Sequence, residues 1–389
     1  MLDFIFEYKT ELLFGKSKEL LVGECIRKIG AKRVLICFGQ SSAKKSGLLD
    51  NVKESLEQAK IKYFEYGGVR ANPVKSHALA GIDFAKENQI DFILALGGGS
   101  VIDEAKCIAV GALYDNGWSF YENSMHTPTK ALPIGAVLTL PAAGSENSTA
   151  SVIRDEKTGR KHSIHAECIR PRFAFINPEL CFSLPKNQIA NGSSDILAHL
   201  MERYFSPLDN VVISDKLLTG AMQGLFEIAQ RVYNDNTNYD YWSEFCLIGS
   251  LAHNDMLSLG RAKQDWGCHS IENMLLSGIY NTAHGTGLAI IFPAWLKYVS
   301  KTKPSKVLQF ATEIMGAEGK TSEEIISNGI KKLERFYKSL NLPVTLAEMS
   351  IAANDVKKLV RTYYKPEVVL GGYGELKISD IEKVIELAK

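Results

Sequence analysis

Paired cysteines, long apolar runs and an excess of one charge are all missing from this chain of 389 residues. Its seven cysteines include no Cys-x-x-Cys pair, which disfavours a disulfide framework or a thiolate zinc site and favours a reducing cytosol. The 45 basic and 44 acidic residues give a net charge of +1, which argues against nucleic acid or an anionic membrane surface as the main partner. No run approaches the roughly 20 apolar residues of a membrane span, and the first ten residues do not resemble a signal peptide. The sequence therefore predicts a cytoplasmic protein that binds neither nucleic acid nor membrane.

A change in the pattern of apolar residues divides the chain near its middle. Before that point, continuously apolar strand candidates alternate with amphipathic helix candidates, which is typical of a parallel sheet covered by helices. The strand candidates are 33–38, 62–66, 92–96, 134–140 and 173–176. The helix candidates among them are 17–29, 47–59, 75–87 and 103–113. Ligands of such sheets bind outside the carboxyl ends of the strands.

Helical periodicity dominates after Leu184-Pro185. The expected helices there are 188–205, 211–232, 242–258, 322–339 and 378–388. We therefore predict an α/β domain with a Rossmann-like parallel sheet over residues 1–185 and an all-helical domain over residues 186–389, with a cleft between them for the site. The alternating segment 4–8 is either an edge strand that pairs with a second copy of the chain or a lone terminal strand.

One strand candidate runs from Leu96 directly into Gly97-Gly98-Gly99-Ser100 and then into a helix. Three glycines let the backbone approach a pyrophosphate closely, and the start of the helix offers N–H groups to it. The alternative is a tight turn with no ligand, and Asp103 is also suited to capping the helix. The G-x-G-x-x-G of a standard Rossmann fingerprint is absent.

The first strand candidate is followed by a turn without an acidic residue, Gly39-Gln-Ser41-Ser42-Ala-Lys44-Lys45. An enzyme that prefers NAD usually places an acidic side chain against the ribose 2′-hydroxyl. Here hydroxyls, backbone N–H groups and lysines are suited to a 2′-phosphate instead. A serine-rich turn exposed to solvent explains the same residues equally well.

A candidate metal site lies in the helical half. Asp195 and His199 are four residues apart in a helical pattern, so both side chains lie on one helical face. His269 and His284 follow in the same half, and each histidine alone is more often an ordinary core or surface residue. Glycines after His284 would let a ligand come close to the backbone. One carboxylate and three imidazoles would suit Fe²⁺, Zn²⁺ or Mn²⁺.

Taken together and in order, several motifs resemble those of the iron-containing (group III) alcohol dehydrogenases, in the branch of butanol dehydrogenases and NADPH-dependent aldehyde reductases. The motifs are Gly97-Gly98-Gly99-Ser100-x-x-Asp103-x-x-Lys106, Thr139-Leu-Pro-Ala-Ala-Gly-Ser-Glu146, Asp195-x3-His199, His269 and Ala283-His-Gly285. The resemblance covers essentially the whole chain. It implies a dehydroquinate synthase-like architecture, in which residues 1–185 bind the dinucleotide and residues 186–389 bind the metal and the substrate.

The resemblance also implies a reaction and a set of site residues. The reaction is hydride transfer between a nicotinamide cofactor and a small primary alcohol or aldehyde, with one divalent metal, Fe or Zn, polarising the substrate oxygen. The metal ligands would be Asp195, His199, His269 and His284. The cofactor residues would be Gly39, Ser41, Ser42, Gly98, Gly99, Ser100, Asp103, Thr139 and Lys161. Through the turn at Gly39, the resemblance favours NADP(H) over NAD(H), and it implies a homodimer.

Three positions depart from the pattern of the family. Asn273 stands where a second histidine is usual, and an amide cannot act as an acid or base near neutral pH. Ala143 replaces a threonine, which removes one hydroxyl contact to the cofactor, and Asn177 replaces an aspartate before Pro178, which we interpret as local turn chemistry. No catalytic residue beyond the metal ligands is therefore assigned.

Two alternative functions remain open at this level. The first is a polyol or phosphorylated-substrate enzyme of the same superfamily, either glycerol dehydrogenase-like or cyclase-like. It would need a cationic pocket, and no dense cluster of Lys and Arg lies beside the metal residues in sequence. The second is a protein that binds the cofactor without catalysis, which only Asn273 suggests.

Overall fold

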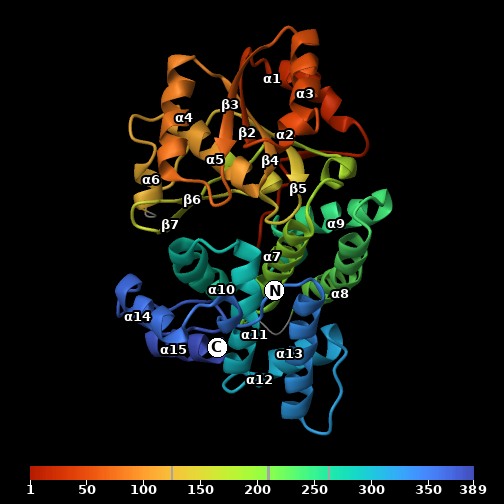
Figure 1. Ribbon diagram of the computed structural model, residues 1–389, viewed down its shortest axis with the longest axis vertical. Helices are drawn as coiled ribbons and strands as arrows, with labels where there is room; N and C mark the ends of the chain where they lie inside the picture. Colours follow the sequence, from red (N-terminus) through yellow and green to blue (C-terminus); the bar gives the residue numbers. More distant parts are fainter. Residues whose placement is uncertain (124–125, 208–210, 262) are drawn as a thin grey trace. The chain divides into compact units, whose positions relative to one another are not determined.

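The computed structural model describes residues 1–123, 126–207, 211–261 and 263–389. Its described residues form two compact units (Figure 1). The sheet unit consists of residues 7–184 and 236–254, and the helical unit consists of residues 1–6, 185–235 and 255–389. By packing, the segment 236–254 belongs with the sheet although it follows position 185 in sequence.

The sheet unit contains a parallel sheet in the order β1-β8-β5-β4-β2-β3. Its strands are β1 (Glu11–Phe14), β2 (Arg33–Gly39), β3 (Lys62–Val69), β4 (Phe92–Gly98), β5 (Ile134–Leu140) and β8 (Phe173–Ile176). The central strands are buried along nearly their whole length, which explains why they read as continuous apolar runs. The five predicted strands are confirmed, and β1 was not predicted.

Helices cover both faces of this sheet (Figure 1). They are α1 (Val22–Ile29), α2 (Ser42–Lys45), α3 (Leu48–Gln58), α4 (Lys75–Glu87), α5 (Gly99–Gly111) and α6 (Ser119–Glu122). One core cluster joins buried residues of α1 and α3 to β2 and β4. A short antiparallel hairpin, β6 (Ala150–Arg154) with β7 (Lys161–His165), follows β5 and was also not predicted.

The order of the strands creates a switch point between β2 and β4. After β2 the chain adds β3 on the outer side, and it then returns past β2 to form β4 on the inner side. Because these strands are parallel, β2, β4 and β5 end at the same edge of the sheet, at Gly39, Gly98 and Leu140. Ligands of open α/β sheets bind at such a point.

The helix α9 (Tyr239–Ala252) belongs to the sheet unit because it holds the loop that follows β5. The ring nitrogen Nδ1 of His253 lies 2.6 Å from the carbonyl oxygen of Ala143. The hydroxyl of Ser250 donates to the buried carboxylate of Glu146. The sequence predicted a helix here at 242–258, and the structure places it over 239–252.

The helical unit is built around α7 (Lys186–Tyr204) and α11 (His284–Val299). Its other helices are α8 (Val212–Asn234), α10 (Gly267–Ile271), the π-helix η6 (Glu272–Tyr280), α12 (Pro304–Gln309), the π-helix η7 (Phe310–Ile314), α13 (Ser322–Ser339), α14 (Ala353–Tyr363) and α15 (Ile378–Leu387). Nearly every residue of α11 is buried, as expected of a helix that is apolar all round. The predicted fold class, a parallel α/β domain followed by a helical domain, is confirmed.

The N-terminal segment differs from the strand that the sequence suggested. Segment 4–8 forms no strand with the described residues, and Phe4 and Ile5 are exposed there. The strand that starts the sheet is β1, which pairs with β8 in the same chain. None of the described helices is both long enough and apolar enough to cross a membrane.

Candidate functional site

Three segments of the helical unit bring the four predicted metal residues together. Asp195 and His199 lie one turn apart on α7, while His269 comes from α10 and His284 is the first residue of α11. The potential ligand atoms of Asp195, His199 and His269 all lie within 4.8 Å of one another. The Nε2 atom of His284 is 3.6 Å from Oδ1 of Asp195, and that of His269 is 3.9 Å from the same oxygen. The carboxylate of Asp195 is therefore at the centre of the cluster.

Each of the three imidazoles has an oxygen acceptor at its Nδ1 atom. The Nδ1 of His199 lies 2.8 Å from the backbone oxygen of Asp195. The Nδ1 of His269 lies 2.9 Å from Oε1 of Glu202, and the Nδ1 of His284 is bonded to the carboxylate of Glu272. Because a carbonyl or carboxylate only accepts, each neutral ring carries its proton on Nδ1. This tautomer leaves Nε2 as the metal-binding atom, which is the usual arrangement in metal sites.

Two glutamates beside the histidines, Glu202 and Glu272, were not identified from the sequence, although helical spacing indicates the first of them. Glu202 follows Asp195 by seven residues and His199 by three, which puts it on the same face of α7. Glu272 follows His269 by three residues, but its partner His284 is twelve residues away along the chain. Helical spacing could have found Glu202, whereas the pairing of Glu272 with His284 depends on tertiary packing.

The donor set and its burial fit a divalent cation. Asp195, His199 and His269 are all buried. Burial lowers the pKa of His199 well below its ordinary value, with the charges of His269 and Arg203 acting in the same direction, so this ring is neutral. Neutral imidazoles and a carboxylate bind metals such as iron and zinc, and a buried glutamate lies behind each of two rings, His269 and His284.

Two glycines at the start of α11 make this packing possible. A Cβ atom on Gly285 would lie 2.1 Å from the backbone oxygen of Asn191 in α7. A Cβ atom on Gly287 would lie 2.6 Å from both Cγ and Oε1 of Glu272. The sequence suggested that these glycines admit a ligand, but the groups that come close to them are the backbone of α7 and the side chain of Glu272.

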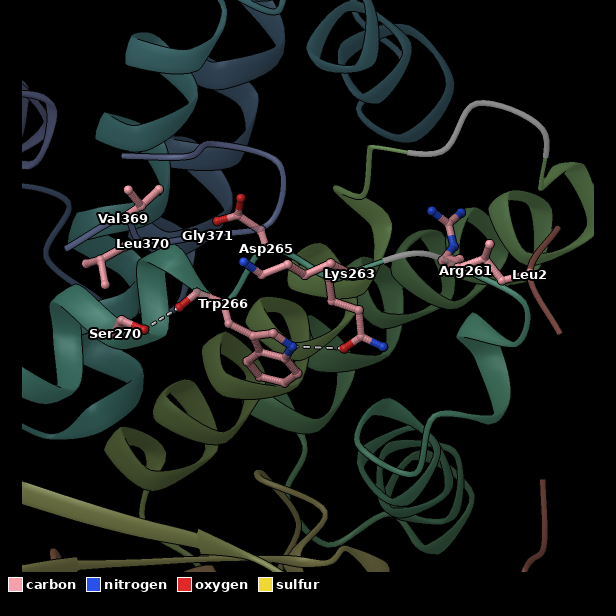
Figure 2. Close-up of a pocket in the computed structure, with 10 residues that line it drawn as sticks. Leu2, Arg261, Lys263, Asp265, Trp266, Ser270, Val369, Leu370 and Gly371 are labelled. Atoms are coloured by element: carbon pink, nitrogen blue, oxygen red, sulfur yellow. Dashed lines mark hydrogen bonds between the residues drawn. The ribbon is translucent and has the colours of Figure 1, made fainter. Parts of the chain in front are cut away.

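Trp266 forms part of the surroundings of the histidines. Its indole contacts His269 and His199 edge to face, with ring centroids 5.2 and 5.9 Å apart. Its Nε1 donates to Oε1 of Gln264 at 2.9 Å (Figure 2). The same side chain lines an open pocket of about 550 Å³ in the helical unit, together with Asp265. The pocket thus shares one wall residue with the histidine cluster.

Asp265 fixes the loop from which Trp266 projects. Its carboxylate accepts hydrogen bonds from the backbone N–H groups of Gly267, Tyr373 and Gly374. Burial raises the pKa of Asp265 to about 7. The aspartate therefore ties the start of α10 to a loop more than a hundred residues further along the chain.

The predicted cofactor residues of the sheet unit lie mostly at the edge where β2, β4 and β5 end. Gly39 ends β2, the exposed Ser41 directly precedes α2, and the exposed Ser42 begins that helix. Gly98 ends β4 and Gly99 begins α5, followed by Ser100. Thr139 is the second-last residue of β5, whereas Lys161 begins β7 of the hairpin.

The start of α5 has the properties of an anion-binding helix terminus. It is thirteen residues long, and no side chain caps it. Its first N–H groups therefore lack a side-chain acceptor, and the helix dipole favours negative charge at that end.

Asp103 has a different position from the one that capping would require. Its two carboxylate oxygens accept from the hydroxyl of Ser145 at 2.6 Å and from the backbone N–H of Val152 at 3.0 Å. The capping alternative is wrong because α5 begins four residues earlier. Burial raises the pKa of Asp103, and the positive charges of Lys106 and Lys161 oppose that rise. Its carboxylate thus holds the segment after β5.

The structure shows where the three residues that depart from the family pattern lie, Asn177, Ala143 and Asn273. Asn177 accepts from the N–H of Glu179 and donates to the buried carboxylate of Glu19 at 3.2 Å, so the prediction of turn chemistry is confirmed. An aspartate at this position would face Glu19 with like charge. Ala143 adjoins Gly99, where an added Cβ would be 3.5 Å from that of Ala143. Asn273 lies in the π-helix η6, and such helices are frequent at functional sites.

A glycine-rich loop at the edge of a parallel sheet and a buried carboxylate–imidazole cluster are together typical of a metal-dependent dehydrogenase. Residues 9–178 match the family model for iron-containing alcohol dehydrogenase, and residues 189–388 match that for the C-terminal region of the Fe-containing alcohol dehydrogenase family. The chain belongs to the iron-containing alcohol dehydrogenase family, and it is an oxidoreductase.

Relatives resemble the chain over its whole length. It is 37% identical over 392 residues to the probable NADH-dependent butanol dehydrogenase 1 of Bacillus subtilis, covering 100% of this chain and 99% of that protein. It is 30% identical to the NADPH-dependent aldehyde reductase of Escherichia coli K12, covering 93% and 92%. The crystal structure of NADH-dependent butanol dehydrogenase A from Thermotoga maritima superposes with a TM-score of 0.94 at 34% identity, covering 100% and 99%.

Proposed function

We propose that this protein interconverts a small aldehyde and the corresponding primary alcohol with a nicotinamide cofactor and one divalent metal, Fe or Zn. The observation that carries the proposal is the buried cluster in which Nε2 of His269 and His284 lies within 4 Å of the Asp195 carboxylate. Names of full-length relatives, which include butanol dehydrogenases and an aldehyde reductase, support the substrate class.

In this proposal, Asp195, His199, His269 and His284 hold the metal within the helical segment 186–389. When bound, the metal supplies Lewis-acid polarisation of the substrate oxygen, and the nicotinamide supplies or accepts the hydride. The protein contributes fixed ligands, because Glu202 and Glu272 orient two of the imidazole rings.

The dinucleotide is assigned to the sheet segment 1–185. Gly98, Gly99 and Ser100 would bind its pyrophosphate at the uncapped start of α5. Thr139 and Lys161 would contact the nicotinamide half and a ribose or phosphate, and Asp103 would hold the adjoining segment. These roles rest on the family resemblance together with the common strand edge.

We further propose a preference for NADP(H) over NAD(H). Gly39, Ser41 and Ser42 would accept the 2′-phosphate, because the turn after β2 has exposed hydroxyls and no acidic residue. Among the relatives, some have names with NADH and others names with NADPH. A direct comparison of KM and kcat for the two cofactors decides this point.

The same proposal includes a homodimer in the cytoplasm. Large apolar side chains near the N-terminus are exposed in the single chain, including Ile5 at 95%. Exposed apolar residues grouped in this way are more typical of an interface than of a monomer's surface. Light scattering on the purified protein is expected to give twice the mass of one chain, and a monomer mass would remove this part of the proposal.

Turnover of a simple aldehyde tests the function directly. Butanal with NADPH should give loss of nicotinamide absorbance, which a chelator abolishes and added Fe²⁺ or Zn²⁺ restores. Asp195→Ala should lose this turnover while still binding NADPH, since it changes only the metal cluster. No turnover of butanal with either cofactor in metal-loaded protein, but turnover of glycerol or a phosphorylated substrate, would overturn the proposal in favour of the polyol or phosphorylated-substrate alternative.

A further inference from the structure

Lys106 is a fully buried lysine on α5, two turns after the glycine-rich loop. Its ammonium group lies within hydrogen-bond distance of five oxygen atoms. They are the backbone oxygens of Ser145 at 2.7 Å, Ser148 at 3.1 Å and Ala150 at 2.7 Å, and the hydroxyls of Ser145 at 2.9 Å and Ser148 at 3.3 Å. All five belong to one short segment, so the ammonium holds this segment much as a bound cation would.

The segment that Lys106 holds adjoins the candidate site for the pyrophosphate. An added Cβ atom on Gly99 would lie 3.5 Å from the Cβ of Ala143 and 3.9 Å from that of Ser145. The hydroxyl of Ser145 accepts from Lys106 and donates to Asp103, so two oppositely charged residues of α5 act on the same serine. Residues 143–145 therefore form a wall beside the first residue of α5.

We propose that Lys106 is a positioning residue for cofactor binding, which fixes residues 143–150 as the wall beside Gly99. This inference rests on the proposed function, because it assumes that the uncapped start of α5 receives the dinucleotide. Lys106 itself is fully buried behind that wall, so it acts through the wall and is not a ligand of the cofactor.

Because the proposal depends on the positive charge of Lys106, it predicts that cofactor binding varies with pH. The groups that face its ammonium are the carboxylates of Asp103 and Glu146 and the guanidinium of Arg170. Burial lowers the pKa of Lys106 to about 8, although both carboxylates act to raise it. A neutral amine has two N–H donors in place of three and no positive charge to attract the remaining oxygens. The wall should therefore loosen above about pH 8 in the native protein.

Binding of NADPH and NADH to Lys106→Met, followed by nicotinamide fluorescence, tests the inference. We expect a Kd at least roughly 10-fold higher than in the native protein, because charge-assisted hydrogen bonds in a buried site are lost. Metal content should be unchanged, since the metal residues lie in the helical unit. Lys86→Met is the matched control, because Lys86 donates to one carbonyl oxygen at the surface of the same unit and its loss should leave Kd unchanged.

The dependence of Kd on pH distinguishes positioning from general stability. Native protein should bind the cofactor progressively less tightly above about pH 8, and Lys106→Met should lose this dependence. If the variant does not fold, the pH titration of the native protein decides. Equal Kd values for native protein and Lys106→Met, or no weakening of native binding between pH 7 and 9.5, would overturn the inference. Failure of the native protein to bind either cofactor would instead overturn the proposed function.

Discussion

Replacement of Glu272 by glutamine removes a negative charge behind His284 with almost no change in shape. The carboxylate is fully buried, bonds to Nδ1 of His284 and accepts from the hydroxyl of Ser277 at 3.0 Å. An amide oxygen at the same place still accepts from the ring, but it polarises the imidazole less. Loss of such an outer partner typically costs 10- to 100-fold in metal affinity, about 1.4–2.7 kcal/mol. We expect Glu272→Gln near the lower end of this range and Glu272→Ala near the upper end, since alanine also frees the ring to rotate.

Competition with a chromophoric chelator measures this change without catalysis. Metal-free native protein, the two variants and the control Glu334→Gln are titrated with Zn²⁺ in the presence of the chelator. Glu334 pairs with Lys297 on the surface of the same unit, so its change should leave the Kd for Zn²⁺ unaltered. Equal affinities of native protein and Glu272→Ala would refute the reasoning that the glutamate positions His284.

Three further changes test other parts of the structure. Gly285→Ala forces a methyl group against the backbone of α7 and should lower the free energy of unfolding by about 1–3 kcal/mol in urea titrations. Asn177→Asp puts a second carboxylate beside the buried Glu19 and should also destabilise the fold, by about 1–3 kcal/mol, with partial recovery at acidic pH. The hydrogen bond from His77 to the buried Glu104 raises the pKa of His77, so the stability it adds is present below the unfolded-state pKa of about 6.5 and is lost as pH rises through the higher folded-state pKa. His77→Gln should therefore be less stable than native protein at pH 6 by about 0.5–1 kcal/mol, with the difference vanishing at high pH.

The sequence predicted the elements whose residue pattern fits only one type of secondary structure. Strands β2, β4, β5 and β8 are buried on both faces, so each reads as an apolar run of strand length. The strands β6 and β7 have mixed burial, so alternation gave no clear signal, although Gly159 turns the chain between them with a φ of +70°. Helix α11 was not predicted, because it is apolar all round and contains Pro293.

The candidate site could be predicted only in part, because several of its residues meet through contacts between distant segments of the chain. The pair Asp195 and His199 follows from helical spacing within α7. Joining His269 and His284 to them required the family resemblance, because they come from other helices. Glu272 and the five oxygens around Lys106 are brought into place by contacts between segments distant in the chain, which no local pattern records.

Titration of metal-free protein with Co²⁺, followed by absorption spectroscopy, tests the central claim most directly. We expect one ion per chain and a ligand-field spectrum of nitrogen and oxygen donors. We also expect that His269→Ala and His284→Ala each weaken binding. A binding stoichiometry of zero, or an intense thiolate-to-cobalt charge-transfer band that points to a cysteine such as the buried Cys268, would contradict the assignment of Asp195, His199, His269 and His284 as the metal site.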